Sequence, residues 1–151
     1  MSKFGFDKMP SLMKQNIKTA VSKMAHHTVK YFGDSFSKQG IGGEKWDEVQ
    51  RRIPGTPAFM SENIWGHTRP PLYGTTGNLR SETKNGLKII TDRSFTIENN
   101  LPYAAIQNYG GVNGRGGNVP ARPFIKQTNE LTQEHLNTLK EETGKTWRQV
   151  S

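Results

Sequence analysis

The chain has 151 residues, no cysteine and a formal net charge of +8 at pH 7. Without cysteine there are no disulfides, thiolate metal sites or cysteine nucleophiles, and the length fits a single domain over residues 1–151. No apolar run approaches the roughly 18 residues that cross a bilayer, so we expect a soluble, non-secreted protein whose positive charge favours anionic partners.

The first predicted element is a long helix between Ser11 and Phe32. Its apolar side chains recur every three or four residues, which is the spacing of one helix face, and Ser11 fits the N-cap. Four lysines on this segment have no carboxylate on the same helix: Lys14, Lys18, Lys23 and Lys30. They indicate either an ordinary solvated face or a surface turned toward a DNA channel or an acidic partner.

Residues 37–76 are rich in proline and glycine, and we expect an extended arm or loop there, with at most a short helical turn at 44–52. Three of its aromatic residues predict burial, either on the chain's own core or on a neighbouring subunit: Trp46, Phe59 and Trp65. If the neighbouring subunit covers them, Trp46→Ala blocks assembly without unfolding the monomer.

A short helix from residue 76 to 85 comes next, and two strands follow it. These strands, 87–91 and 95–98, are expected to form an antiparallel hairpin with one buried face. Another short helix, 102–109, ends at Gly110-Gly111. Tyr103 and Tyr109 share one of its faces, which favours core packing, with a binding surface as the alternative.

Residues 112–118 are predicted to form a flexible glycine-rich loop that carries Arg115. Residues 119–124 are then extended, because Pro120 and Pro123 are typical of an edge strand. Arg122 between them has the planar guanidinium that pairs with a carboxylate or phosphate, and Phe124 anchors the segment in the core.

A C-terminal helix is expected over 126–142, with residues 143–151 as a tail. The predicted fold class is therefore α+β: a long N-terminal helix and a C-terminal helix pack on a small, mostly antiparallel sheet of three or four strands, with the arm inserted after the first helix.

No catalytic or metal-binding pattern stands out. The histidines His26, His27, His67 and His135 contain no pair four residues apart, the spacing that lets a helix hold a metal from one face. A nucleophile elbow and a paired-carboxylate pattern are also missing. We therefore expect no enzyme, no metal and no cofactor.

Three segments occur in a recognisable order: Thr75-Thr76-Gly77-Asn78-Leu79-Arg80-Ser81, then Leu101-Pro102-Tyr103-Ala104-Ala105-Ile106-Gln107-Asn108-Tyr109-Gly110-Gly111, then Val119-Pro120-Ala121-Arg122-Pro123-Phe124-Ile125. Together they resemble the virion morphogenesis proteins of tailed phages, the tail completion or neck proteins typified by the Mu-like tail protein G. That family's pattern is T/D-G-x-L-R, P-Y-A-x-I-H-x-x-G-G and I-P-A-R-P-F, and Gln107 stands where its histidine is common.

The resemblance implies a structural protein of the head-tail connection. It would form a homo-oligomeric ring at the virion neck or tail end that joins the DNA-filled capsid to the tail, after assembly in the host cytoplasm. A hexamer is expected, with a dodecamer as the alternative. The implied partners are further copies, head-tail adaptor or portal-side proteins, tail tube or tail terminator proteins and, non-specifically, packaged DNA, but no membrane.

The residues expected at subunit or partner interfaces in such a ring are Trp46, Phe59, Trp65, Arg80, Tyr103, Tyr109, Gly110, Gly111, Arg115, Pro120, Arg122, Pro123 and Phe124. A second hypothesis is a basic cytoplasmic nucleic-acid-binding module whose aromatic side chains stack on single strands. It is weakened because most of these aromatics lie in the arm, apart from the lysines of the first helix.

Overall fold

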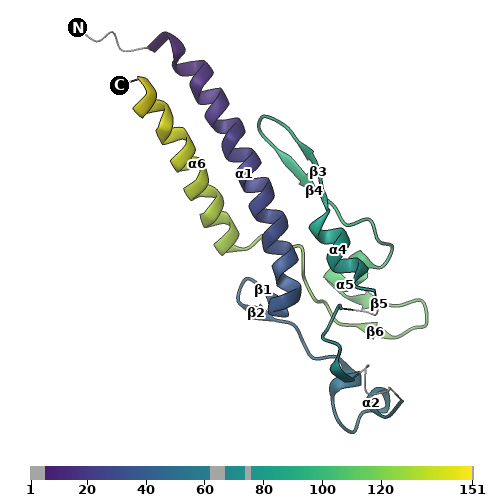
Figure 1. Cartoon of the computed structure of the whole chain (residues 1–151). Coiled ribbons are helices and arrows are strands. Elements are labelled where there is room, and N and C mark those ends of the chain that lie inside the picture. Colours follow the sequence, from purple (N-terminus) through teal and green to yellow (C-terminus); the bar gives the residue numbers. More distant parts are fainter. Residues whose placement is uncertain (1–5, 62–66, 74–75, 151) are drawn as a thin grey trace. The chain divides into compact units, whose positions relative to one another are not determined.

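The computed structural model describes residues 6–61, 67–73 and 76–150, so Trp65 lies outside the described residues. The predicted α+β class is confirmed: a long helix stands near each end of the chain, with short antiparallel strands between them (Figure 1). The chain divides into two compact units. Unit 1 holds residues 1–31, 86–98 and 127–151, and unit 2 holds residues 32–85 and 99–126. Whether the whole chain folds as one domain stays a prediction.

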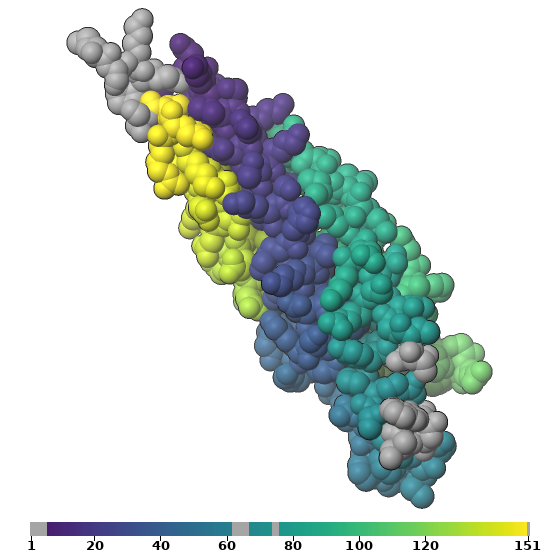
Figure 2. Space-filling model, in the orientation of Figure 1, coloured from purple at the N-terminus to yellow at the C-terminus, as the bar shows by residue number. Residues whose placement is uncertain are grey.

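Two long helices run antiparallel in unit 1. Helix α1 (Met9–Lys38) follows the single turn η1 (Phe6–Lys8) and contributes its first part to this unit, where α6 (Asn129–Val150) packs along it (Figure 1). The Asn16 amide donates to the Thr146 hydroxyl at 2.9 Å, and Thr28, further along α1, bonds to His135, which lies earlier in α6, at 2.8 Å. The two helices therefore run in opposite directions. In Figure 2 the side chains of α6, in yellow, lie directly against those of α1, in purple.

Both helices are longer than the sequence predicts. Helix α1 begins at Met9, so Ser11 is inside its first turn rather than the N-cap, and its hydroxyl donates to the Lys8 carbonyl at 2.8 Å. The predicted tail at 143–151 is wrong, because α6 continues to Val150. Burial of Thr146 and Val150 explains the extension, since tertiary packing stabilises a last turn that Gly144 alone would weaken.

The predicted hairpin of unit 1 is confirmed. Strand β3 (Leu87–Ile90) pairs antiparallel with β4 (Phe95–Ile97), and the Thr91 amide donates to the Ser94 carbonyl at 2.8 Å across the turn. The register shifts between Leu87 and Ile89. The predicted buried face is wrong: Leu87, Phe95 and Ile97 are only half-buried and Ile89 is exposed, because such an irregularity reorients the following side chains.

Short elements make up unit 2, together with the last turns of α1. They are β1 (Gly40–Ile41), β2 (Glu44–Lys45), η2 (Gln50–Arg52), α2 (Pro57–Ser61), α4 (Asn78–Lys84), α5 (Ala104–Tyr109), β5 (Gly111–Val112) and β6 (Asn118–Val119). In the described chain the strands form three separate antiparallel pairs, β1 with β2, β3 with β4 and β5 with β6. The predicted single sheet of three or four strands is thus corrected to three two-stranded pairs, each only two to four residues long.

Trp46 lies in the core of unit 2, so of its two predicted alternatives, burial on the chain's own core is confirmed, and its place among the interface residues is corrected. Gly42 and Gly43 have positive φ angles of 61° and 83° and allow the tight turn between β1 and β2, which returns the chain to the end of α1. There the Phe36 ring centroid lies 5.8 Å from that of Trp46 and 5.3 Å from that of Phe124. Trp46 and Phe124 are both buried, so they are core residues rather than interface residues.

Candidate functional site

The three motif segments meet in unit 2. Leu79, Ala104 and Phe124, one from each segment, belong to the same buried cluster. The buried side chain of Asn108 joins two of the segments: its Oδ1 accepts from the backbone amides of Phe124 and Ile125, both at 2.9 Å, and its Nδ2 donates to the Ile125 carbonyl at 3.2 Å. Helix α5 therefore holds the proline-bearing segment in place.

Gly110 has a role inside this unit rather than at an interface. It ends α5, as predicted, with a φ of +75°. A Cβ added there would lie 2.9 Å from the Ala121 nitrogen and 3.0 Å from the Val119 oxygen. The backbone after α5 and the backbone before Arg122 approach too closely for any side chain.

The predicted glycine-rich loop at 112–118 is an ordered hairpin. Strands β5 and β6 pair through Gly111 with Val119 and Val112 with Asn118. Within the turn, the Asn113 Oδ1 accepts from the amides of Arg115 and Gly117 at 2.9 and 2.8 Å. An asparagine side chain that bonds to the following backbone is a common way to order a turn, so a flexible loop is the wrong description.

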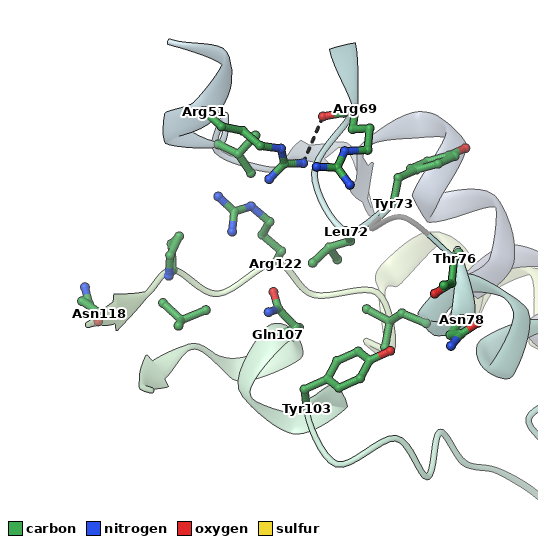
Figure 3. A pocket seen from close by; sticks show the side chains of 15 residues that line it. Arg51, Arg69, Leu72, Tyr73, Thr76, Asn78, Tyr103, Gln107, Asn118 and Arg122 are labelled. Carbon is green, nitrogen blue, oxygen red and sulfur yellow. Dashed lines mark hydrogen bonds between the residues drawn. The ribbon is translucent and has the colours of Figure 1, made fainter. Parts of the chain in front are cut away.

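A cavity of about 400 Å³ opens in unit 2 beside these segments. Figure 3 shows Arg51, Arg69 and Arg122 gathered on one side of it, with Tyr103 and Gln107 of the α5 region on another. The remaining lining residues are Val49, Leu72, Tyr73, Thr76, Gly77, Asn78, Leu79, Asn118, Val119 and Pro120. Three guanidinium groups thus come together from distant parts of the sequence.

Backbone carbonyls orient two of these arginines. An Arg51 Nη2 donates to the carbonyls of Arg69 and Pro70 at 3.0 and 3.2 Å, and the Arg122 Nε donates to the Asp47 carbonyl at 3.1 Å. Arg122 is only 6% exposed. Burial lowers the pKa of its guanidinium, while the charges of Asp47 and Glu48 act in the opposite direction. An arginine remains protonated at neutral pH, so the Arg122 guanidinium keeps its positive charge at the wall of the cavity.

Several predicted interface residues contact their own unit. The Arg80 Nη2 donates to the Ser37 hydroxyl at 3.0 Å, and the guanidinium carbon lies 5.6 Å from the centre of the Tyr73 ring. Phe59 stacks on the His67 ring at a centroid distance of 4.0 Å. The Pro123 carbonyl accepts the indole N–H of Trp46 at 2.7 Å.

Other predicted interface residues are on the surface. Tyr109 is 77% exposed and Tyr103 is 43% exposed, so core packing is wrong for Tyr109. Gly111, Arg115 and Pro120 are exposed as well.

The lysines of α1 are not a free cationic face. Lys14 and Lys18 lie 3.7 and 3.3 Å from the carboxylate of Asp92 on the β3–β4 turn, and Lys23 lies 2.5 Å from the buried carboxylate of Glu142. Hydrogen bonds from Lys145 and from Lys23 lower the pKa of Glu142. The carboxylate partners come from other elements, which is why the helix sequence alone did not reveal them. Lys30 is exposed.

Helix α6 carries an exposed apolar stripe that the sequence analysis missed. Leu136, Leu139 and Trp147 are 42%, 36% and 59% exposed, and their spacing places them on one helix face. The face that packs on α1 is instead partly polar and includes Glu142 and Thr146. Trp147 was overlooked because the helix was predicted to end at residue 142.

Arg51 and Arg69 were missed for a different reason. They lie in a segment interpreted as an arm, where only proline and aromatic residues were weighed. The one available signal was arginine directly before proline, in Arg69-Pro70-Pro71; that signal is weak, and Arg51 had none.

Among the described residues no group of three or more His, Asp or Glu side chains could hold a metal ion. No helix in the described ranges is both long enough and apolar enough to span a bilayer. Comparison of the chain with protein-family models, curated proteins and solved structures gives no significant match.

Proposed function

We propose that the protein is a structural subunit of the head-tail connection of a tailed-phage virion, where further copies assemble with it into a ring. The motif order of the sequence supports this proposal. The residues of the three motif segments contribute to both the core and the surface of unit 2. Leu79 and Phe124 lie in the core, and Tyr109 at the end of α5 is exposed.

The exposed apolar stripe of α6 carries the proposal. Leu136, Leu139 and Trp147 occupy one face of a helix whose other contacts, to α1, are already made. Several exposed apolar side chains on one helix face are typical of a protein interface. Each of these side chains would contribute up to about 1.5–3 kcal/mol when fully covered.

A second exposed apolar patch suits a head-to-tail ring. Tyr109 and Val112, in unit 2, are 77% and 69% exposed. In a closed ring one patch of each subunit meets a different patch on the next copy, and two unlike apolar patches meet that requirement. A hexamer is the copy number we propose, with a dodecamer as the alternative.

The test is the oligomeric state of the full-length chain, measured by mass photometry and sedimentation equilibrium, with electron microscopy of the particles formed. Trp147→Ser and Leu139→Ser should shift the chain toward monomers, while Gln133→Ala, an exposed polar position on the same helix, should assemble normally. All three variants should keep their thermal unfolding midpoint, because exposed positions contribute little to stability. A wild-type chain that stays monomeric and is missing from purified virions would refute the proposal.

A further inference from the structure

The hairpin of unit 1 is a sheet of only two strands. Within the described ranges β3 pairs with β4 alone (Figure 1), so each strand has an outer edge whose main-chain groups point away from the hairpin. The edge of β3 contains Lys88 and the register shift after Leu87, and both a lysine and an irregular register discourage strand addition. Strand β4 has neither feature and no proline, so its outer edge is the open one.

The hydrogen bonds at the two ends of the hairpin determine which main-chain groups of β4 face β3. The Thr91 amide donates to the Ser94 carbonyl, and the Glu98 amide donates to the Gly86 carbonyl, both at 2.8 Å. Alternate residues of a strand direct their main-chain groups to the same side. Ser94 and Glu98 therefore face β3, and so does Thr96, which lies midway between them.

The main-chain groups of Phe95 and Ile97 point the other way. In the described part of the chain neither residue makes a main-chain hydrogen bond on that outer side. The Phe95 ring meets the His135 ring of α6 edge-on at a centroid distance of 6.0 Å, which keeps one face of the strand on the helices of its own unit. An edge with unpaired N–H and C=O groups is a template for pairing with an extended strand of another chain.

The sequence of β4 is complementary to itself about Thr96. A second copy of the strand that runs antiparallel and is centred there places Thr96 opposite Thr96 of the second copy, and Phe95 opposite its Ile97. Threonine pairs and aromatic–β-branched pairs both stabilise neighbouring strands. The outward main-chain groups of Phe95 then meet those of Ile97 in a pair of hydrogen bonds, which the two-fold axis repeats.

The charges at the two ends of β4 agree with an antiparallel pair. Arg93 at the turn and Glu98 at the opposite end of the strand are exposed and have opposite signs. Antiparallel pairing brings the Arg93 end of one copy beside the Glu98 end of the other, whereas parallel pairing would bring like charges together. Asp92, next to Arg93, has its carboxylate 3.3 Å from the Lys18 ammonium of its own unit. A second copy of this chain is therefore the occupant that the edge fits.

We propose that β4 binds β4 of a second copy through antiparallel, two-fold pairing centred on Thr96, which joins the two hairpins into one four-stranded sheet. The contact goes beyond the proposed ring and does not rest on it. A two-fold interface uses the same patch on both copies, whereas a head-to-tail ring uses two different patches.

A single introduced cysteine tests the register, because the chain has no cysteine of its own. Opposite residues of a non-hydrogen-bonded antiparallel pair have Cα atoms about 4.5 Å apart, a separation that a disulfide can span. Under mild oxidation the full-length Thr96→Cys variant should form a covalent dimer on a non-reducing gel. Arg93→Cys, exposed on the same hairpin but away from the axis, is the control and should remain unlinked. Equal cross-linking of both variants, or none in Thr96→Cys, would overturn the proposal.

A charge variant tests the association itself. Thr96→Lys places two like charges opposite each other at an exposed position and should weaken pairing by about tenfold or more. Thr19→Lys adds the same charge at an exposed position of α1 and should leave the association constant unchanged. Both are measured by sedimentation equilibrium in the Trp147→Ser background, at higher concentration than the ring assay, so failure of the ring and failure of strand pairing are observed separately. Equal association constants for the two lysine variants would contradict the pairing.

Hydrogen exchange of individual amides identifies what covers the edge. The amides of Phe95 and Ile97 should gain protection as the protein concentration rises, while the amide of Thr96, bonded within the hairpin, should be protected at every concentration. Protection of Phe95 and Ile97 that does not depend on concentration would overturn the proposal, because the edge would then be covered by its own chain.

Discussion

Asn108 provides the sharpest test of how unit 2 is held together. Its buried amide makes three hydrogen bonds to the backbone of Phe124 and Ile125. Replacement by alanine removes all three and leaves two N–H groups and one carbonyl without these partners. At a net contribution of about 1 kcal/mol for each hydrogen bond, and more for a buried group left unpaired, we expect Asn108→Ala to lower the free energy of unfolding by about 3–5 kcal/mol.

Two further variants separate hydrogen bonding from packing. Asn108→Leu keeps a similar volume but restores no hydrogen bond, so it should be as unstable as the alanine variant. Asn100→Ala makes the same chemical change at an exposed position of unit 2 and should change the unfolding free energy by less than about 0.5 kcal/mol.

The measurement combines denaturant unfolding with hydrogen exchange of individual amides. In Asn108→Ala the amide protons of Phe124 and Ile125 should lose protection more than amides elsewhere in the unit. Stability recovered by Asn108→Leu, or unchanged exchange at these two amides, would refute the reasoning and point to side-chain packing instead.

Three other predictions follow from single contacts. Trp46→Ala should lower the free energy of unfolding by about 3–5 kcal/mol in denaturant titrations, as for other buried tryptophans, whereas an intersubunit role for Trp46 would leave the monomer's stability unchanged. Gly110→Ala should lower the thermal midpoint, because its Cβ would meet backbone at 2.9 Å, and a wild-type midpoint would contradict that close approach. Burial lowers the pKa of His135, so the unfolded chain binds more protons than the folded chain below about pH 6.5 and stability should fall as the pH drops through that value. His135→Gln should reduce the dependence of the free energy of unfolding on pH in this range, and the exposed control His26→Gln should not.

Local patterns determined most of the elements. The three-to-four spacing of apolar residues predicts α1, because that spacing is a property of the helix itself. The hairpin of β3 and β4 follows from two β-branched and aromatic runs around Asp92-Arg93-Ser94, and α5 ends at Gly110-Gly111 as expected. In each case the deciding residues are within a few positions of one another.

The tertiary structure decided where the side chains of those elements go. The sequence around Trp46 is the same whether its indole is buried in its own unit or on a neighbouring subunit. Only the turn at Gly42-Gly43 places Trp46 on Phe36. The pairs of Lys18 with Asp92 and of Lys23 with Glu142 join residues more than seventy positions apart.

The arginine cavity depends on such distant contacts throughout. Arg51, Arg69 and Arg122 share no local pattern, because a cavity is formed by the spatial convergence of segments, and the sequence around each segment does not specify which others it will meet. The presence and type of the longer elements could therefore be predicted from neighbouring residues, while their exact ends and the site required the packing of each whole unit.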